Sequence, residues 1–294
     1  MSLPFFIVDV FAVESLTGNP LAVVLDEGKL DESKMLAIAR EMNYSETTFI
    51  RSTDPQNGGY PVRIFTPTKE LPFAGHPTLG TAYILLQNLL NQPLENLKLN
   101  LPVGQIPVRV NRDEQGNLLL WMQQNSPNFY DNFNPHEIAE ILGISPGQID
   151  YRFPIQAVST GIPFIIVPLK NLQAVKDSKI QREQYFDWIQ DKRAQEILVF
   201  SPETYNPQHQ LNVRVFAEAI GIPEDPATGS ANGCLAAYLS QHNYFGTPDF
   251  DIQVEQGYEI NRPSLLYLKT DIAATKIQVF VGGKVLLVAQ GELV

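Results

Sequence analysis

Short apolar runs bounded by turn residues dominate the hydrophobic pattern of the chain, and only a few segments have helical periodicity. Runs of this kind are typical of buried or half-buried strands. Single strands are predicted at Thr47–Ile50 and Val62–Thr66. Two β-hairpins are predicted where paired runs flank turn residues: Ile106–Val110 with Leu118–Met122, and Ile277–Val281 with Lys284–Val288. The chain is therefore expected to be rich in strands.

Helical spacing is clearest in Asp31–Met42, where Met35, Ile38 and Met42 form one apolar stripe. Another helix is predicted to start at Asn134-Pro135-His136-Glu137 and to end at Gly143, since this segment offers an N-cap residue, proline at the first position and glutamate at the third. Gln181–Arg193 predicts one more helix. Strands mixed with few helices predict an α+β fold.

Two further helices differ from these because they are apolar on nearly every side. One follows Gly75-His76, with Pro77 expected at its first position, and the other follows Gly229-Ser230. Helices that are apolar all round are buried. We therefore expect one such helix inside the curved sheet of each half, with first-turn amides that the helix itself cannot satisfy.

The two halves of the chain resemble each other. Thr17-Gly18-Asn19-Pro20 is echoed by Thr160-Gly161-Ile162-Pro163, Arg63-Ile64-Phe65 by Arg214-Val215-Phe216, and the seven residues from Glu70 to His76 by those from Glu224 to Ser230. The offsets are 143, 151 and 154 residues, each near half of the 294-residue chain. Three matches in the same order predict two pseudo-symmetric domains, residues 1–126 and 127–294, joined near 125–135; the last strand is free to pair back with the first half.

Composition narrows the possible classes of protein. The chain has 44% hydrophobic residues, which excludes disorder, and a formal charge of −11, which disfavours nucleic acid and anionic membranes as partners. The single cysteine, Cys234, excludes an intramolecular disulfide and a thiolate metal cluster, and we expect it to be a core residue. No basic region precedes the first apolar run, so a cytoplasmic location is expected.

The starts of the two apolar helices are the candidate functional site. Open N–H groups and the helix dipole attract anions, and glycine allows a ligand to approach closely, so Gly75, Gly229 and Ser230 are candidates for binding a substrate carboxylate. His76 either exchanges a proton or hydrogen bond with the substrate or only caps its helix. Asp225 is either a second functional carboxylate or a turn residue before proline.

The other charged residues of the repeat have two possible roles. Arg63 and Arg214 either orient the substrate or pair with Glu70 and Glu224, which occupy matching positions of the two halves.

Phosphate-binding loops, dinucleotide fingerprints and the H-E-x-x-H metal motif are missing from the sequence. These common motifs therefore give no indication of a metal or a cofactor.

Three blocks of the sequence resemble the PhzF family of phenazine-biosynthesis isomerases. They are Ser45-Glu46-Thr47-Thr48-Phe49, the segment from Leu71 to Thr78, and the segment from Glu224 to Ala231. The resemblance runs nearly from end to end. It implies a diaminopimelate-epimerase-like fold in which each half is a sheet wrapped around a central helix, a site in the cleft between the halves, and often a homodimer.

The resemblance also implies roles for single residues. The family's catalytic glutamate corresponds to Glu46, and its supporting histidine, aspartate and serine correspond to His76, Asp225 and Ser230. The expected reaction is a cofactor-independent isomerisation of a small carboxylic acid, in which Glu46 removes a proton from carbon and returns it elsewhere. To act in both directions near neutral pH, Glu46 should titrate above the ordinary value of about 4.3.

Two other functions remain open at this point. An amino-acid racemase or epimerase would use the same groups as opposed bases, although a mechanism with two cysteine bases is impossible with Cys234 alone. A non-catalytic protein that binds a small acid would need no proton transfer.

Overall fold

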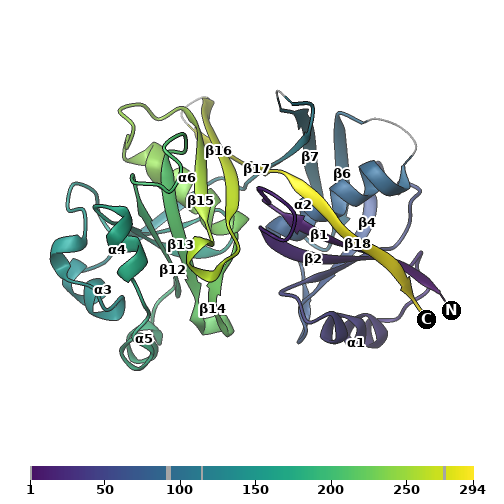
Figure 1. Ribbon diagram of the computed structural model, residues 1–294, viewed down its shortest axis with the longest axis horizontal. Helices are drawn as coiled ribbons and strands as arrows, with labels where there is room; N and C mark the ends of the chain where they lie inside the picture. Colours follow the sequence, from purple (N-terminus) through teal and green to yellow (C-terminus); the bar gives the residue numbers. More distant parts are fainter. Residues whose placement is uncertain (1, 91–93, 114, 274–275) are drawn as a thin grey trace. The chain divides into compact units, whose positions relative to one another are not determined.

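The computed structural model describes residues 2–90, 94–113, 115–273 and 276–294, which form two compact α+β units. One unit contains the residues up to Gln123 together with Gly282–Val294, and the other contains Gln124–Val281. The sequence boundary at 126/127 assigns residues 282–294 to the second half. The structure groups them with the first because β18 (Val285–Leu293) pairs with β1 (Leu3–Val10) along its whole length (Figure 1).

The sheet of the first unit runs in the order β18, β1, β2, β3, β4, β6, β7 and β8, with the short β5 paired to β4. The β2–β3 and β4–β6 pairs are parallel and the other pairs are antiparallel. Its further elements are β2 (Asn19–Leu25), α1 (Glu32–Met42), β3 (Thr47–Ile50), β4 (Tyr60–Phe65), β5 (Glu70–Leu71), α2 (Gly75–Ile84) with a final π-turn (Leu85–Leu89), β6 (Asn96–Leu101), β7 (Gly104–Arg112) and β8 (Leu118–Gln123).

Helix α1 covers one face of this sheet. Its N-cap, Asp31, accepts a hydrogen bond from the amide of Lys34. Met35 and Ala39 are fully buried against Val24 and Phe49 of the sheet. Helix α2 lies against the opposite face, where it contacts β1, β2, β3, β7 and β8. A side chain on Gly80 of α2 would lie 2.5 Å from Cδ2 of Leu21 and 3.0 Å from Cγ2 of Val10, so a larger residue would force these buried side chains to move.

The second unit has the sheet order β9, β10, β11, β12, β13, β15 and β16, with the short β14 paired to β13. Its elements are β9 (Asn128–Asn132), α3 (Pro135–Ile141), β10 (Gln156–Ser159), β11 (Pro163–Pro168), α4 (Leu172–Asp177), α5 (Arg182–Ile189), β12 (Glu196–Ser201), β13 (Leu211–Ala217), β14 (Ile222–Asp225), α6 (Gly229–Gln241), β15 (Phe250–Gln256) and β16 (Ser264–Ala273), with single turns of 3₁₀-helix at Pro146–Gln148, Glu218–Ile220 and Tyr258–Ile260. Strand β17 (Lys276–Gly283) then leads back to the first unit.

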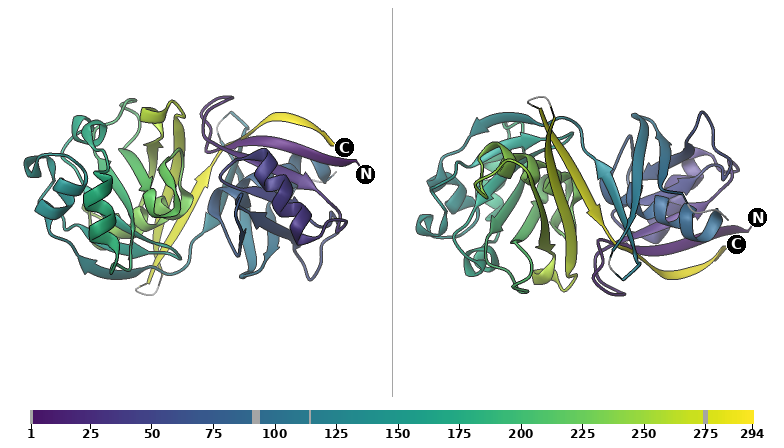
Figure 2. Two further views of the ribbon diagram at one scale, coloured as in Figure 1. Left: turned by 90° about the horizontal axis from the view of Figure 1, so that it is seen from below. Right: turned by 90° about the horizontal axis from the view of Figure 1, so that it is seen from above.

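The pairings of the two units match strand by strand. The β2–β3 and β4–β6 pairs are parallel, as are β11–β12 and β13–β15, and the remaining pairs are antiparallel in both units. Helix α6 occupies the place of α2 and contacts β10, β11 and β16, while α3, α4 and α5 pack on the other face (Figures 1 and 2). All of β12 is buried because helices cover both faces of its sheet. The internal repeat in the sequence therefore corresponds to a repeated fold.

Several predicted elements differ from the observed ones in detail. The helix predicted over Gln181–Arg193 ends at Ile189, its last buried apolar residue. The segment predicted to close a hairpin with Ile277–Val281 forms β18 and pairs with β1. Pro77 occupies the third position of α2 and not the first, which the helix tolerates because first-turn amides have no intrahelical partner. Within the described ranges, no helix combines the length and apolar character needed to cross a bilayer.

Candidate active site

Glu46 lies immediately before β3, the strand that is hydrogen-bonded to both β2 and β4. The chain reaches it from α1 through Asn43, whose left-handed conformation ends the helix. Successive side chains of a strand point to opposite faces, so Glu46 shares a face with Thr48. The hydroxyl of Thr48 accepts a hydrogen bond from Thr81 of α2. Glu46 is therefore directed to the side of the sheet on which α2 lies.

His76 is the second residue of α2, and its side chain is 8% exposed. Its Nε2 atom lies 3.4 Å from Oε2 of Glu46, whose side chain is 16% exposed. The structure thus brings together two predicted site residues that are 30 positions apart in the sequence. The fold achieves this because the start of β3 and the start of α2 meet on one face of the sheet.

The environment of His76 sets its protonation state. Burial lowers the pKa of His76 to about 3, so the imidazole is neutral near pH 7. A neutral imidazole has one N–H donor and one acceptor nitrogen, whereas an imidazolium has two donors. The histidine can therefore donate a hydrogen bond to a developing negative charge without carrying a positive charge of its own.

The second unit carries the other predicted residues. Asp225 ends β14 and is 8% exposed, and the Thr228 hydroxyl donates a hydrogen bond to its carboxylate. Ser230 is the second residue of α6, which is the position of His76 in α2. The structure therefore places Asp225 and Ser230 within one loop and helix start, separated by a single turn of chain. The pair formed by Glu46 and His76 belongs to the first unit, and Asp225 and Ser230 belong to the second.

Both apolar helices begin without a side-chain cap among the described residues. Ala74 precedes α2 and Thr228 precedes α6, and neither accepts a hydrogen bond from the first turn of its helix through its side chain. The carbonyl oxygens of Ala74 and Thr228 accept hydrogen bonds from the amides of Thr78 and Asn232. The amides of Gly75 and His76, and those of Gly229 and Ser230, come earlier in each helix than these first intrahelical donors. They have the open-donor geometry expected of anion-binding helix starts.

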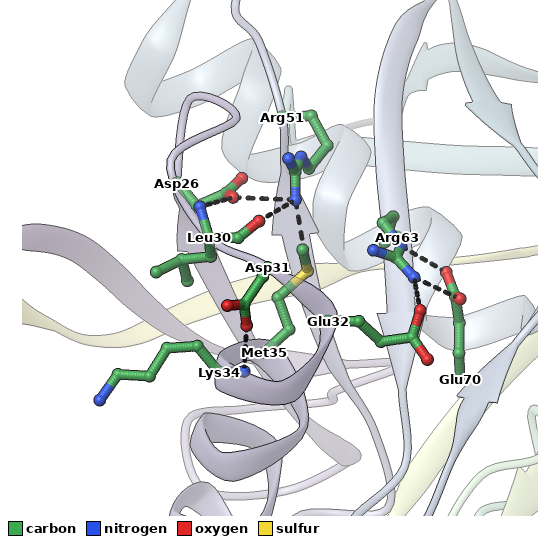
Figure 3. A network of polar contacts seen from close by, with 9 residues as sticks. All are labelled: Asp26, Leu30, Asp31, Glu32, Lys34, Met35, Arg51, Arg63 and Glu70. Carbon is green, nitrogen blue, oxygen red and sulfur yellow. Dashed lines mark hydrogen bonds and ion pairs between the residues drawn. The ribbon is translucent and has the colours of Figure 1, made fainter.

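The arginines of the repeat pair with the repeat glutamates. Arg63 makes a bidentate contact with Glu70 and also reaches Glu32 of α1 (Figure 3). Arg214 contacts Glu224 in the same way. In each unit this pair ties the strand before the central helix to its short partner strand. Of the two roles left open by the sequence, the structure supports the one in which these residues brace the loops.

Cys234 is fully buried in α6, and burial raises the pKa of its thiol to about 11. Its sulfur donates to the carbonyl oxygen of Ile162. The structure therefore makes Cys234 a core residue, as predicted. Across the described parts of the chain, no three His, Cys, Asp or Glu side chains converge as ligands for a metal ion.

Sequence reasoning missed the residues that hold the Asp225 loop, by which we mean residues 225–228. The side-chain amide of Gln256, at the end of β15, donates to Asp225 O and accepts from the Thr228 amide. Gly257 has a φ of +79°, and a side chain there would lie 2.5 Å from the carbonyl oxygen of Pro226. The hydroxyl of Ser264 donates to that same oxygen. The available signal was a glutamine before a glycine at a strand end, which indicates a close backbone approach but not its partner.

Comparison with known proteins identifies the family of this chain. Residues 8–291 match the family model described as phenazine biosynthesis-like protein. The chain belongs to the PhzF family. It is 35% identical to the trans-2,3-dihydro-3-hydroxyanthranilate isomerase of Pseudomonas fluorescens, over 99% of both chains. The PhzF family protein of Bacillus anthracis superposes with a TM-score of 0.91 at 29% identity, covering 100% of this chain and 99% of that one.

More distant structures share only the fold. A probable proline racemase from Agrobacterium radiobacter K84 has a TM-score of 0.62 at 9% identity, covering 99% of this chain and 93% of that one. The predicted epimerase-like fold and the membership of the PhzF family are thus confirmed. The curated relatives at about 35% identity also establish that this PhzF chain is an isomerase.

Proposed function

We propose that this PhzF isomerase acts on a small carboxylic acid by cofactor-independent proton transfer. The contact between Glu46 and His76, at 3.4 Å on one face of the first sheet, is the observation that carries the proposal. In the proposal, the Glu46 carboxylate removes a proton from a carbon beside an unsaturated or carboxyl-bearing centre. The same carboxyl group then returns the proton to another carbon, so that the substrate is rearranged without a net change in composition.

The negative charge that develops on the substrate needs hydrogen-bond donors. His76 supplies a neutral donor, because its pKa lies far below neutral pH. The open amides at Gly75–His76 and Gly229–Ser230 supply backbone donors. In the proposal Asp225 of the second unit is a further carboxylate that orients the substrate. The Glu46 side chain is 16% exposed, so a substrate bound beside it would exclude much of the remaining water.

The proposal is tested with trans-2,3-dihydro-3-hydroxyanthranilate, the compound in the name of the Pseudomonas fluorescens relative, and with a panel of cyclic and amino carboxylic acids in heavy water. NMR of the products detects both rearrangement and incorporated deuterium. Glu46→Gln should lower turnover by about 10²- to 10⁴-fold, the usual range for loss of a general base. Glu41→Gln, at an exposed position of α1, is the matched control and should retain activity.

The outcome of the labelling experiment separates the possible functions. Deuterium at a new carbon together with a shifted double bond supports the positional isomerase. Deuterium at an existing stereocentre with loss of optical activity would instead identify a racemase or epimerase. Binding without any exchange, or full turnover by the Glu46→Gln variant, would contradict the proposal.

A further inference from the structure

The side chain of Gln256 is fully buried beneath the Asp225 loop, and its amide group is completely hydrogen-bonded. The Nε2 atom donates to the Asp225 carbonyl oxygen at 2.8 Å and to the Thr228 hydroxyl oxygen at 3.1 Å. The Oε1 atom accepts from the Thr228 amide at 3.2 Å and from the Asn232 side chain at 2.8 Å. Two donors and two acceptor positions are all that a glutamine amide has, so its orientation is fixed.

These contacts give the hydrogen bonds a direction. Because Gln256 donates to the oxygen of the Thr228 hydroxyl, the hydroxyl hydrogen is free to point elsewhere. It points to Oδ2 of Asp225, which accepts it. A hydroxyl group that donates to a carboxyl oxygen stabilises the ionised form of that carboxyl group. The chain of donors from Gln256 through Thr228 therefore ends on the side chain of Asp225.

The first half of the chain provides an internal comparison. In the repeated block, Leu71 matches Asp225 and Ala74 matches Thr228. The register of the strands identifies the third position: Pro61 pairs with Asn100 in the first unit, and Asn212 pairs with Glu255 in the second. The next residue on each strand is Leu101 or Gln256. All three positions are thus polar in the second half and apolar in the first.

This comparison argues against a merely structural role for the three polar residues. Both halves have proline after the first position and glycine at the start of the central helix, namely Pro72 and Gly75 in one half and Pro226 and Gly229 in the other. The first half has a short strand, a turn and a helix start at the matching positions without any of the three polar side chains. The local backbone therefore does not require them. They occur together where the loop carries a carboxylate.

We propose that Gln256 is a positioning residue for the isomerisation. It orients the Thr228 hydroxyl toward Asp225 and, through the Thr228 amide, fixes the start of α6 relative to that carboxylate. Asp225 and the open amides of Gly229 and Ser230 are thereby held in one arrangement. This inference rests on the proposed function, since it assumes that Asp225 and these amides engage the substrate.

The test compares Gln256→Leu and Thr228→Ala, which introduce the apolar character of the first half, with the conservative Thr228→Ser. We expect Gln256→Leu to lower kcat by about 10- to 100-fold with KM changed less than about 3-fold, because a small displacement of a reacting group has costs of this size. Thr228→Ser should retain most of the activity. In an Asp225→Asn background, Gln256→Leu should have an effect smaller than about 3-fold, because the group through which it acts is already removed.

A second measurement does not depend on activity. In protein labelled with ¹³C at aspartate carboxyl carbons, the Asp225 resonance is identified by its loss in Asp225→Asn. Gln256→Leu should shift this resonance at pH 7, although the Gln256 side chain contacts only the backbone of Asp225, and the shift should disappear in a Thr228→Ala background. Gln256→Met, which keeps the side-chain volume, replaces Gln256→Leu if the leucine variant does not fold. Asn212→Ala removes another buried amide from the same sheet and is the control, which should leave the resonance unchanged.

The two measurements distinguish the inference from the proposed function. A shifted resonance with a loss of kcat supports both. A shifted resonance with unchanged turnover supports the hydrogen-bond chain and contradicts the role of Asp225 in catalysis. An unshifted resonance in both Gln256 variants overturns the inference, whatever the activity.

Discussion

The guanidinium of Arg214 lies 2.7 Å from the carboxylate of Glu224, and the matching atoms of Arg63 and Glu70 lie 2.6 Å apart in the other half. The two ion pairs have the same bidentate geometry but different surroundings. Arg214 is 9% exposed and also donates to the carbonyl oxygens of Val175, Lys176 and Ser178. The Arg63 side chain is 26% exposed. Because the two ion pairs share one geometry but differ in exposure, the effect of burial on the strength of an ion pair can be measured within a single protein.

We expect Arg214→Met to lower the free energy of unfolding by about 3 kcal/mol, because it leaves the Glu224 carboxylate and three carbonyl oxygens without this donor. Arg63→Met should cost about 1 kcal/mol, because water can solvate the groups it leaves behind. Urea unfolding followed by circular dichroism measures both. Adding Glu224→Gln to Arg214→Met should recover part of the loss. Equal costs for the two arginine variants would show that burial does not decide the strength of these pairs.

The buried imidazole of His76 makes stability depend on pH. Histidine in an unfolded chain titrates near pH 6.5, whereas burial lowers the pKa of folded His76 to about 3. The unfolded state therefore binds more protons between these values. The contribution of His76 to stability is fully present above about pH 6.5 and is lost as the pH falls, by at most about 1.4 kcal/mol per pH unit.

The protonation of His76 can be observed directly by ¹⁵N NMR of the ring. We expect the shifts of a neutral imidazole down to about pH 5, even though the nearby Glu46 carboxylate favours the protonated form. His76→Gln, compared with the wild type in urea unfolding, should reduce the slope of stability against pH in the same range. A ring that protonates near pH 6 would contradict the neutral-donor role.

The buried carboxyl group of Glu196 should make stability depend on pH in the opposite direction to His76. This residue of β12 is 7% exposed, burial raises the pKa of its carboxyl to about 7, and its Oε2 atom has no hydrogen-bond partner among the described residues. The folded state therefore binds the extra proton between about pH 4.5 and 7, and the contribution of Glu196 to stability falls as the pH rises through that window. Glu196→Gln should stabilise the protein by about 2 kcal/mol at pH 8 and have little effect at pH 4.5.

The measurement is again urea unfolding, at both pH values. Glu140→Gln, at an exposed position of α3, is the matched control and should show no such pH dependence. If Glu196→Gln destabilises the protein at pH 8, the ionised carboxylate has a stabilising partner and the expectation is wrong.

Cys234 should be chemically inert in the folded protein. Its thiol is fully buried with a pKa raised to about 11, so very little thiolate is present at pH 8. A thiol reagent should modify Cys234 only after denaturation. Cys234→Ala should retain activity within about 2-fold and cost about 1 kcal/mol of stability, as expected for the loss of one small buried group. If Cys234→Ala folds normally but loses turnover, the thiol takes part in the reaction and the expectation is wrong.

Much of the fold follows from local patterns that the sequence displays. The helix predicted over Asp31–Met42 is observed as α1, which spans Glu32–Met42, because its apolar stripe is a local signal. The central helices are recognisable because they are apolar on every side. The helix of Gln181–Arg193 was predicted too long because its end is set by burial of Ile189 and by no local stop signal such as glycine. The partner of β18 was unpredictable from local pattern, because β1 lies at the other end of the chain.

The site is less accessible to sequence reasoning than the fold. From spacing alone, Glu46 is indistinguishable from a surface glutamate, and only its resemblance to the PhzF family selects it. Its proximity to His76 depends on strand parity and on the placement of α2, which are properties of the assembled sheet. Gln256 is harder still, because its partners lie 24 to 31 residues away and nothing local reveals them.

The pairing of β18 with β1 has a consequence for biosynthesis. Leu3 and Leu293 are neighbours in the finished sheet, although almost the whole chain separates them. During translation, β1 is made long before β18. It therefore pairs with β2 alone until β18 has emerged from the ribosome. For that period the amino-terminal sheet has an open edge, to which other unpaired strands can add. Nascent chains that stall before β18 are therefore the species most in need of a chaperone.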